Sequence, residues 1–543
     1  PQGAVVKVVT VIQADLDTAA QGLPALLGED LAGEPVLRRT VSRAADATLP
    51  DACVVLAQSD EAATAVRTLL DGLPVEVMTV NGGDVPHRDT LRRSRRWARN
   101  AWRGGIGGTT VFDEEGTPAK LLAVCKSAGA DAALEVSPAA ALIDPGTLDG
   151  LLHWVVEQGA TSEFYFTNLP PGLTTALYSV SVLEKLVGLE RTVHQALVYQ
   201  PGRSERDPAE GRCCWAGDDA LRMTPFRLSA DSPRTLERLR AVWDDDTVSA
   251  VARLKETPTL WPGRVPEEVE IEIAAAPRGT DPYAALTGTA QMTDFMDLDA
   301  FARAVGDLAV TGDVNLTFGG LGDPLAHPRF FEFVETARRA GVWGLHLVTS
   351  GRRLDDEKVD RLARCDLDVV SVRLWADTED TFERVTGRRD LARIAALVRG
   401  LLERRRALGR ATPFVIPEMM KSTDTVGEVE TFFDRWYGTA DWVVIRGFND
   451  YAGQVPDRNV LHPYPGVRFP CLQLFRRLNV TVTGEAIMCG QDPLRRRSVG
   501  GVFEKDIETV WHGGELERLR AGHAAGRYDG FDLCGRCRHW YQL

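Results

Sequence analysis

The segment VNLTFGGLGDPLAHPRFFEFVETARRAGVWGLHLVT (Val314–Thr349) contains the unit from which the fold follows. The run VNLTF (Val314–Phe318) is typical of a buried strand, and Arg329–Ala340 has the apolar spacing of a helix. The run LHLVT (Leu345–Thr349) is typical of the next strand. Strands joined through a helix pair in parallel, because an antiparallel hairpin needs only a short turn. The segment therefore predicts a βαβ unit in a parallel sheet that is covered on both faces.

The same alternation continues on both sides of this segment. Further strands are predicted at Val269–Ala274, Asp368–Leu374, Pro413–Met419 and Trp442–Gly447. Further helices are predicted at Leu298–Leu308, Asp355–Ala363, a long region ending at Arg406, and Thr425–Trp436. Six strand–helix units of about 30 residues each predict a parallel barrel or a partial barrel. In such a fold, ligands bind at the C-terminal ends of the strands.

The N-terminal half also alternates strands and helices. Strands are predicted at Val5–Ile12, Ala52–Ala57 and Val75–Val80, and helices near Pro35–Ala45 and at Asp60–Leu73. Helices of this length between strands again imply parallel pairing. Two stretches are rich in Pro, Gly and charged residues: we interpret Pro201–Arg212 as an internal loop and Glu256–Glu268 as a domain boundary.

Composition limits the class of protein. The chain has 543 residues, 44% of them hydrophobic, and a net charge of −14. No apolar stretch reaches the ~18–20 residues needed to cross a bilayer, and no signal peptide is seen, so we expect a cytoplasmic protein without membrane contact. The negative charge argues against nucleic acid as a partner. Nine cysteines are too few for a disulfide scaffold.

Four cysteines gather near the C-terminus. Cys471, Cys489, Cys534 and Cys537 form the pattern C-x17-C-x44-C-x2-C. The C-x-x-C pair places two thiols on one tight turn, and two more cysteines can complete a four-thiolate site for zinc or for an iron–sulfur cluster. A redox disulfide between Cys534 and Cys537 is the alternative, although such pairs usually open a helix after a strand. We interpret the pattern as a metal centre.

The residues around these cysteines resemble a known module. The segments CLQLFRRLNVTVTGEAIMCGQD, VGGVFEKDIETVWHGGELERLRAGH and LCGRC are similar to the SPASM/twitch extension of radical SAM proteins, in a match that runs from Phe448 to Cys537. The four-cysteine form is similar to the twitch version. The resemblance implies one auxiliary [4Fe–4S] cluster, held by Cys471, Cys489, Cys534 and Cys537.

The central region resembles the radical SAM barrel. The first strand is followed by PRGTDPYA, and the family's C-x3-C-x2-C motif falls on Pro277, Asp281 and Ala284. Pro and Ala carry no donor atom, and one Asp cannot hold a soft iron–sulfur core alone. Cys365 precedes a later strand, and we expect it to be a small buried hydrophobe rather than a borrowed ligand. The resemblance thus implies a barrel that makes no 5′-deoxyadenosyl radical.

The segment GLGDPL is similar to the family's glycine-rich loop, which receives the amino group of S-adenosylmethionine. The resemblance assigns Gly320, Gly322 and Asp323 to a vestigial site, with Asp323 where Glu is usual. LVTSGRRL and SVRLWAD match the later strands, which in the family reach the ribose and carboxylate of this cofactor. Without a cluster most of the binding energy is lost, so we do not expect S-adenosylmethionine to bind.

The first ~255 residues resemble sugar-activating cytidylyltransferases, whose sheet is of the GT-A, Rossmannoid kind. This sequence departs from that family at the positions of the catalytic groups. No phosphate-loop Arg or Lys is found near residues 15–26, the metal-binding Asp falls on Ala139, and a further Glu falls on Ala176. Nucleotidyl transfer needs cations and a carboxylate that binds Mg²⁺. Asp144 and Asp231 remain, and we expect them to be helix caps or solvated charges.

Arginines cluster at three places in the sequence. The run RRSRRWARNAWR (Arg92–Arg103) could bind phosphate or nucleic acid, but we expect a solvated helix face with Trp97 and Trp102 buried beneath it. Arg404–Arg406 and Arg495–Arg497 are likewise expected to be exposed.

Taken together, the sequence predicts an α/β protein with three parts. These are a degenerate cytidylyltransferase-like domain (1–256), a radical-SAM-like partial (β/α)6 barrel without cluster cysteines (265–455), and a small Cys-rich SPASM/twitch domain (456–543). This order resembles the spiro-SPASM proteins, a family without a defined role. We expect an iron–sulfur protein that binds a peptide or small molecule, passes electrons to a partner, or acts as a scaffold. The alternatives are a SAM-dependent radical enzyme with unusual ligands and a nucleotidyl or glycosyl transferase with atypical site residues.

Overall fold

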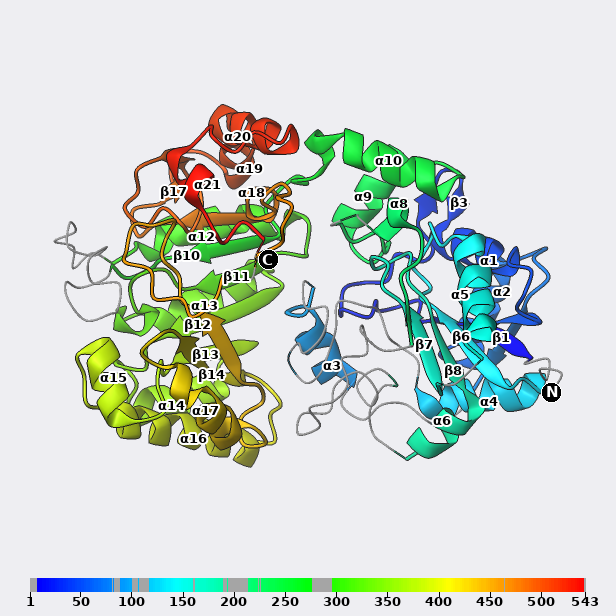
Figure 1. The fold of residues 1–543 in the computed structure, drawn as a ribbon, viewed down its shortest axis with the longest axis horizontal. Helices are drawn as coiled ribbons and strands as arrows, with labels where there is room; N and C mark the ends of the chain where they lie inside the picture. The colour runs from blue at the N-terminus through cyan, green and yellow to red at the C-terminus, as the bar shows by residue number, and fades with distance from the viewer. Residues whose placement is uncertain are drawn as a thin grey trace. The chain divides into compact units, whose positions relative to one another are not determined.

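The structure is a computed structural model that describes residues 7–80, 82, 88–99, 106, 117–159, 162–188, 193, 213–222, 224, 226–275, 295–462 and 464–541. The chain forms two compact units, Pro1–Thr257 and Pro258–Leu543 (Figure 1). The predicted α/β class and the partial barrel are confirmed.

The first unit is built on a seven-stranded sheet in the order β5-β4-β1-β6-β8-β7-β9. Its strands are β1 (Val8–Ala14), β4 (Ala52–Ala57), β5 (Glu76–Thr79), β6 (Ala132–Val136), β7 (Phe164–Thr167), β8 (Ala176–Ser179) and β9 (Cys214–Trp215). Every residue of β1 is buried, as a central strand covered on both faces requires. The pairs β1–β4, β4–β5 and β1–β6 are parallel, whereas β8 runs antiparallel to β6 and β7.

Polar side chains cap the N-termini of several helices in this unit. The helices that the structure describes here are α1 (Val36–Ala45), α2 (Asp60–Leu69), α3 (Arg88–Arg95), α4 (Pro118–Ala128), α5 (Pro145–Glu157), α6 (Val180–Leu186), α8 (Asp219–Arg222), α9 (Pro233–Val242) and α10 (Thr247–Glu256). Asp144 caps α5 by accepting a hydrogen bond from the Thr147 amide at 2.8 Å, so the predicted capping role is confirmed. Asp231 is different: it is 2% exposed and accepts hydrogen bonds from Gln21 and Arg227, so the expected cap or solvated charge was wrong.

The second unit contains a nine-stranded sheet in the order β15-β14-β13-β12-β11-β10-β16-β17-β18. The barrel strands are β10 (Glu268–Ile271), β11 (Asn315–Phe318), β12 (Gly344–Thr349), β13 (Val369–Arg373), β14 (Phe414–Lys421) and β15 (Val444–Gly447). Each pairs in parallel with the next along the chain. The intervening helices are α12 (Leu298–Gly306), α13 (Phe330–Arg339), α14 (Asp356–Arg364), α15 (Glu379–Thr386), α16 (Leu391–Ala407) and α17 (Val429–Trp436). In Figure 1, α14, α16 and α17 lie together along one side of these strands.

The C-terminal segment continues the barrel sheet. Strand β16 (Arg477–Val480) pairs in parallel with β10, and β17 (Glu485–Ile487) and β18 (Ser498–Gly501) follow as antiparallel strands. Four helices complete the segment: α18 (Gln473–Arg476), α19 (Ile507–Trp511), α20 (Gly514–Ala524) and α21 (Asp532–Arg536). One hydrophobic cluster runs through this unit and includes Phe318, Phe333, Trp436 and Trp511. The cysteine-bearing segment and the barrel therefore share a sheet and a core.

Several arginines predicted to be solvated are buried. Arg92 and Arg95 of α3 are buried, and Arg92 donates to the Asp15 carboxylate at 2.7 Å. Arg405 of α16 is buried against Asp441 and the Pro413 carbonyl. A buried guanidinium needs an acceptor, and in each case the fold supplies one from a residue distant in the sequence. These arginines are therefore buried where the sequence predicted exposure. The expectation of solvated faces was wrong at these positions.

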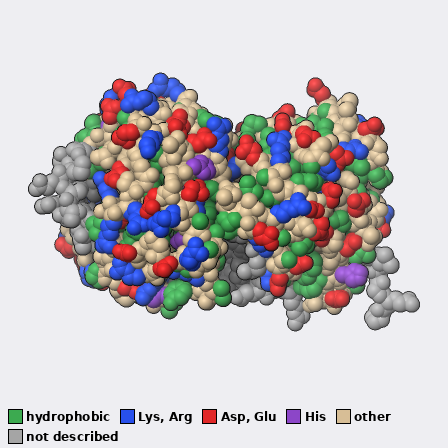
Figure 2. All heavy atoms as spheres, turned by 90° about the horizontal axis from the view of Figure 1, so that it is seen from above, with side chains coloured by type: hydrophobic (Ala, Val, Ile, Leu, Met, Phe, Trp, Pro, Cys, Tyr) green, Lys and Arg blue, Asp and Glu red, His purple; other side chains and the backbone are tan. Residues whose placement is uncertain are grey.

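Basic and acidic side chains are interspersed over the face of the molecule shown in Figure 2. Among the helices that the structure describes, not one combines the length and the apolar character required to span a bilayer.

Candidate metal centre and barrel cavity

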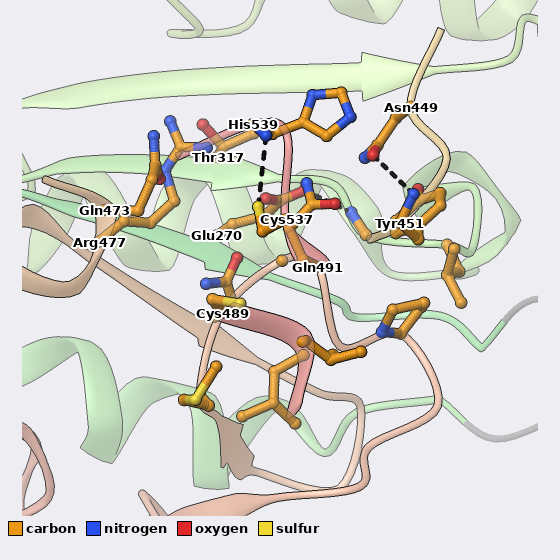
Figure 3. A pocket seen from close by; sticks show the side chains of 18 of the residues that line it. Glu270, Thr317, Asn449, Tyr451, Gln473, Arg477, Cys489, Gln491, Cys537 and His539 are labelled. Atoms are coloured by element: carbon orange, nitrogen blue, oxygen red, sulfur yellow. Dashed lines mark hydrogen bonds between the residues drawn. The ribbon is translucent and has the colours of Figure 1, made fainter. Parts of the chain in front are cut away.

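Three separate segments bring four cysteines to one cavity. Cys471 precedes α18, Cys489 follows β17, Cys534 lies within α21, and Cys537 ends that helix. All four are free thiols that line a cavity of about 670 Å³ in the second unit. In Figure 3, Cys489 and Cys537 are seen on the wall of this cavity with Gln491 near them. The structure thus brings together the four residues that the sequence pattern singled out.

The buried environment of these four thiols disfavours their ionisation to thiolates. Burial raises the pKa of Cys471 to about 12 and that of Cys534 to about 11, and it raises the pKa of Cys489 and Cys537 as well. The other cysteines add to the rise at Cys489, so the four sulfur atoms are close enough to sense one another's charge. Bound metal would supply the positive charge that stabilises four thiolates in this place.

The donors suit two kinds of metal centre. A single zinc ion needs all four sulfur atoms at about 2.3 Å from one point. An iron–sulfur cube binds its four thiolates through four separate iron atoms. Among the residues that the structure describes, no group of three or more His, Cys, Asp or Glu side chains has the geometry to hold one metal ion. The four cysteines supply the number and type of donor that a [4Fe–4S] cluster requires.

Neighbouring groups stabilise negative charge on the sulfur atoms. The amide of His539 donates a hydrogen bond to Cys537 Sγ at 3.3 Å (Figure 3). Arg468 donates to the Cys534 carbonyl oxygen at 2.7 Å, and its charge lowers the pKa of Cys534 and Cys537, opposing their burial. Amide–sulfur hydrogen bonds and nearby charge tune the potential of iron–sulfur centres. His523 accepts a hydrogen bond from the Cys471 amide at 3.2 Å and so fixes that turn.

The same cavity extends along the inner face of the barrel strands. Its walls there carry polar side chains from successive strands: Glu270 on β10, Thr317 on β11, His346 on β12, Arg373 on β13 and Arg446 on β15. Glu418 on β14 is fully buried behind Arg446, which holds it through two hydrogen bonds of 2.7 and 2.8 Å. Sequence reasoning missed this set. In the sequence, the only sign of these polar side chains in the barrel interior is a charged residue inside each of several otherwise apolar strands.

The glycine-rich segment lies at the ends of β10 and β11. Gly320 lines the cavity with φ +95°, and its amide donates to Glu270 at 3.0 Å. The Gly322 amide donates to Glu272 at 3.1 Å, and a Cβ atom at Gly322 would lie 1.8 Å from the Ala274 carbonyl oxygen. Both amides therefore bind carboxylates of the chain itself.

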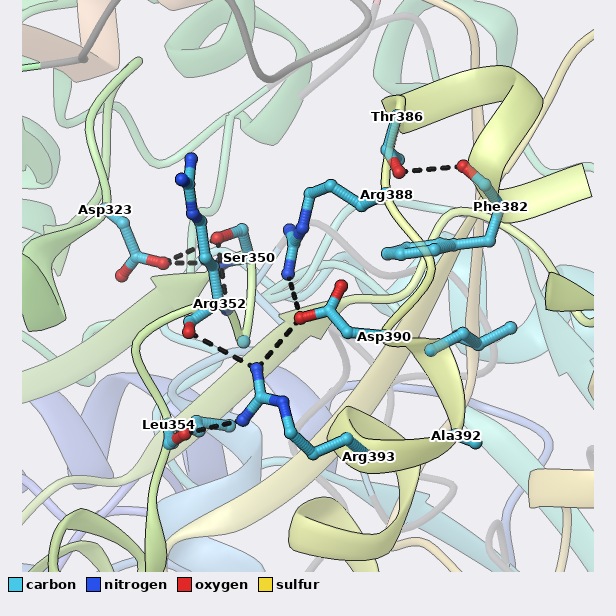
Figure 4. A network of polar contacts seen from close by, with 12 residues as sticks. Asp323, Ser350, Arg352, Leu354, Phe382, Thr386, Arg388, Asp390, Ala392 and Arg393 are labelled. Carbon is cyan, nitrogen blue, oxygen red and sulfur yellow. Dashed lines mark hydrogen bonds and ion pairs between the residues drawn. The ribbon is translucent and has the colours of Figure 1, made fainter.

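Asp323 makes contacts within the fold. Its carboxylate accepts hydrogen bonds from Thr349 Oγ1 at 2.9 Å and from Ser350 Oγ at 2.6 Å (Figure 4). Thr349 ends β12, so Asp323 joins the glycine-rich loop to the next strand. The structure brings Gly320, Gly322 and Asp323 together as one loop, and it assigns the Asp323 carboxylate a role in holding that loop.

The other candidate ligands fall elsewhere. Pro277, Asp281 and Ala284, the positions aligned with the radical cluster motif, lie outside the described residues. Cys365 ends α14, packs against the hydrophobic core and donates to the Leu362 carbonyl oxygen at 3.2 Å. Burial raises its pKa to about 11. This environment agrees with the expected role as a small buried hydrophobe.

In the first unit, the end of β1 is crowded with charge. Asp15 pairs with Arg92, and Arg88 lies 3.6 Å from the same carboxylate. A small cavity beside them, of about 10 Å³, is lined by Gln13, Asp15, Arg88 and Lys120 among others. That volume is about one water molecule. No basic residue is close to Asp15 along the chain, and the fold brings Arg88 and Arg92 from α3 and Lys120 from α4 to this place.

Comparison with protein families identifies two regions of the chain. The model of the radical SAM superfamily matches residues 284–418, and that of SPASM, an iron–sulfur cluster-binding domain, matches residues 471–538. The first match begins at Ala284, and the second extends from Cys471 to one residue beyond Cys537. The chain therefore carries a radical SAM region followed by a SPASM region.

Individual relatives are distant. An uncharacterized protein of Treponema pallidum is 23% identical over 261 residues, which is 45% of this chain and 68% of that protein. The PqqA peptide cyclase of Gluconobacter oxydans is 30% identical over 177 residues, which is 31% of this chain and 46% of that enzyme. A cytidylyltransferase structure from Leptospira borgpetersenii matches 47% of this chain and 96% of its own, at 16% identity and a TM-score of 0.34.

Proposed function

We propose that this protein holds one [4Fe–4S] cluster at Cys471, Cys489, Cys534 and Cys537, on a radical-SAM-like barrel that has lost radical chemistry. Its role would be to bind a peptide or small molecule in the barrel cavity, to exchange electrons with a protein partner, or to act as a scaffold. The cluster would supply a one-electron redox centre or a structural cross-link.

One observation carries the proposal. Cysteines from three segments, separated by up to 66 positions in sequence, line a single cavity as free thiols. The SPASM match covers the same residues. Beside Cys537 an amide points at sulfur, and beside Cys534 a guanidinium adds positive charge. These features support a centre that carries negative charge on sulfur.

The loss of radical chemistry rests on counting donors. None of the nine cysteines stands between Cys214 and Cys365, where the first barrel strand and its following loop lie. The three aligned positions carry Pro, Asp and Ala. A cluster that cleaves SAM is held by three thiolates, which leaves its fourth iron free to bind the cofactor. We therefore infer that the barrel lacks the cluster that cleaves S-adenosylmethionine.

A radical enzyme with unusual ligands is the second candidate. The radical SAM match over residues 284–418 favours it, because this region includes strands β11 to β13 and most of β14. The two candidates differ in product: only the radical enzyme releases 5′-deoxyadenosine when reduced in the presence of S-adenosylmethionine.

The deciding experiment is anaerobic reconstitution followed by iron and sulfide analysis. We expect about four irons and about four sulfides per chain, as one [4Fe–4S] cluster requires. Roughly eight of each, together with 5′-deoxyadenosine after reduction, would establish the radical enzyme instead. Zinc without sulfide would show a structural zinc site and contradict the cluster.

A further inference from the structure

Residues Pro258–Pro266, which we call the strap, lead from the end of the first unit to strand β10. They lie within the predicted domain boundary and begin with the short helix η2 (Pro258–Leu260). Although the strap has little regular structure, Trp261 is 7% exposed and Val265 is 1% exposed. Val265 belongs to the hydrophobic core of the second unit, and η2 contacts α20. The strap is therefore held against the second unit by side-chain packing.

Trp261 packs against the helix that follows the first of the four cavity cysteines. The centroid of its ring lies 5.0 Å from that of Phe475, and the two ring planes are inclined by 61°. Phe475 is fully buried and belongs to α18, which begins two residues after Cys471. A single helical turn has little stability of its own, so neighbouring contacts decide where α18 lies. The surface to which Trp261 docks therefore depends on how firmly Cys471 is held.

Hydrogen bonds hold the next part of the strap to the end of α19. The indole Nε1–H of Trp511 donates to the Pro262 carbonyl oxygen at 3.3 Å. His512 Nε2 lies 3.1 Å from the Gly263 carbonyl oxygen, and because a carbonyl oxygen only accepts, His512 is the donor. Both acceptors are backbone groups, so these two bonds fix the path of the chain itself.

Helix α20 connects the helices that hold the strap to a cavity cysteine, and it lies beside α18 (Figure 1). The guanidinium of Arg520 is buried between three helices: its Nε donates to the Leu474 carbonyl oxygen of α18 at 2.9 Å. Its Nη1 donates to the Trp511 carbonyl oxygen of α19 at 2.7 Å. One turn later in α20, His523 Nδ1 accepts a hydrogen bond from the Cys471 amide at 3.2 Å. The same helix thus contacts Cys471 and both helices against which the strap packs.

We propose that docking of the strap depends on the cluster. While Cys471 is a cluster ligand, α18 and α20 stay in place and the strap remains docked, and when the cluster is lost the strap opens. A ligand that binds only the closed form of a protein lowers the population of locally opened forms. The coupling is reciprocal, so a docked strap also favours retention of the cluster. This inference rests on the proposed four-cysteine cluster and goes beyond it, because the state of the centre then governs the segment that follows the first unit.

Limited trypsin digestion of the reconstituted and the metal-free protein tests this coupling. The side chain of Arg264 is 52% exposed, but the peptide bond after it leads to the buried Val265. A protease needs extended chain on both sides of the bond, so cleavage there requires the strap to open. We expect cleavage after Arg264 to be roughly tenfold faster in the metal-free protein, which is a usual strength for coupled sites. Cleavage after the exposed Lys126 of the first unit should not change and is the internal control.

Two substitutions distinguish docking of the strap from general stability. Trp261→Ala removes the ring that packs on α18, so the strap should be cleaved rapidly with or without metal. By reciprocity, this variant should also release iron to the chelator bathophenanthroline several-fold faster than the wild type. Trp343→Ala is the matched control, because Trp343 is 8% exposed and precedes β12, outside the strap and the cysteine-bearing segment. Its iron release and its cleavage after Arg264 should match those of the wild type.

Several results would overturn the inference and leave the proposed function standing. Equal rates of cleavage after Arg264 in the metal-free protein and in a protein with about four irons per chain would show that the strap does not sense the cluster. Faster cleavage of the metal-free protein throughout the second unit, rather than first after Arg264, would show general unfolding. Equal iron release by Trp261→Ala and Trp343→Ala would show that docking does not stabilise the centre. A chain that takes up no iron and sulfide would instead refute the proposed function, and the inference with it.

Discussion

The Glu272 carboxylate on the barrel side of the cavity accepts a hydrogen bond from Arg495 Nη2 at 2.8 Å, across 223 positions of sequence. Arg495 lies in the loop after Cys489, and Glu272 also accepts from the Gly322 amide. One carboxylate, whose side chain is 8% exposed, therefore joins the glycine-rich loop to the cysteine-bearing segment. Burial raises the pKa of Glu272, although Arg495 opposes the rise.

Replacing Arg495 should destabilise the second unit. Arg495→Gln leaves a buried carboxylate without its cationic partner, which costs roughly 1–3 kcal/mol. Chemical unfolding monitored by circular dichroism measures the difference. Arg329→Gln is the matched control, because the Arg329–Glu332 pair is about half exposed and water screens its charges, so its loss should have little effect. Equal effects of the two substitutions would show that the buried pair has no special role.

Glu418 should make stability depend on acid pH. Burial opposes its ionisation, but the charge and hydrogen bonds of Arg446 outweigh burial and lower the pKa from 4.5 to about 2. A carboxyl with a lowered pKa in the folded state contributes stability above pH 4.5, and this contribution is lost as the pH falls toward 2. The free energy of unfolding of the wild type should therefore decline more steeply below pH 4.5 than that of Glu418→Gln. Parallel pH profiles, measured by urea unfolding of the metal-free proteins, would contradict this assignment.

Substitutions should distinguish the cysteines that bind the cluster from the cysteines that only pack in the fold. Cys489→Ser is expected to lose most of the reconstituted iron and the visible absorption of the cluster, because a hydroxyl is a poor ligand for this centre. Cys365→Ser, which alters a partly buried thiol outside the cavity, should retain about four irons. Iron analysis and absorption spectra on both variants decide the matter. A full complement of iron in Cys489→Ser would remove this residue from the ligand set.

Gly322 should not tolerate a side chain. Its Cβ atom would lie 1.8 Å from the Ala274 carbonyl oxygen, so Gly322→Ala must shift backbone at the end of β10 and should cost about 1–3 kcal/mol or more. Gly306→Ala is the control: a Cβ there meets nothing within 4 Å, and alanine in a helix is favourable by up to about 1 kcal/mol. Thermal unfolding should therefore move in opposite directions for the two variants. A shift of the same sign and size would refute the close approach.

The elements of the barrel were predictable because each strand is a short apolar run between amphipathic helices. The cysteine set was predictable because thiols at C-x2-C spacing near other cysteines have few alternatives. Interior charge was not predictable. Arg373 and Glu418 lie in strands that are otherwise largely apolar, and nothing near them in the sequence shows which group each charge meets inside the barrel. Arg405 was misjudged for the same reason, since its partner Asp441 is 36 positions away.

The pairing of β16 with β10 has a consequence for shortened chains. Strand β10 is the first strand of the partial barrel, and β16 saturates the hydrogen-bonding groups along its outer side. In a polypeptide that ends before residue 471, these backbone amides and carbonyls would be unpaired. A strand of another molecule could then pair with the exposed edge. The cysteine-bearing segment thus also covers this edge of the barrel and opposes its self-association.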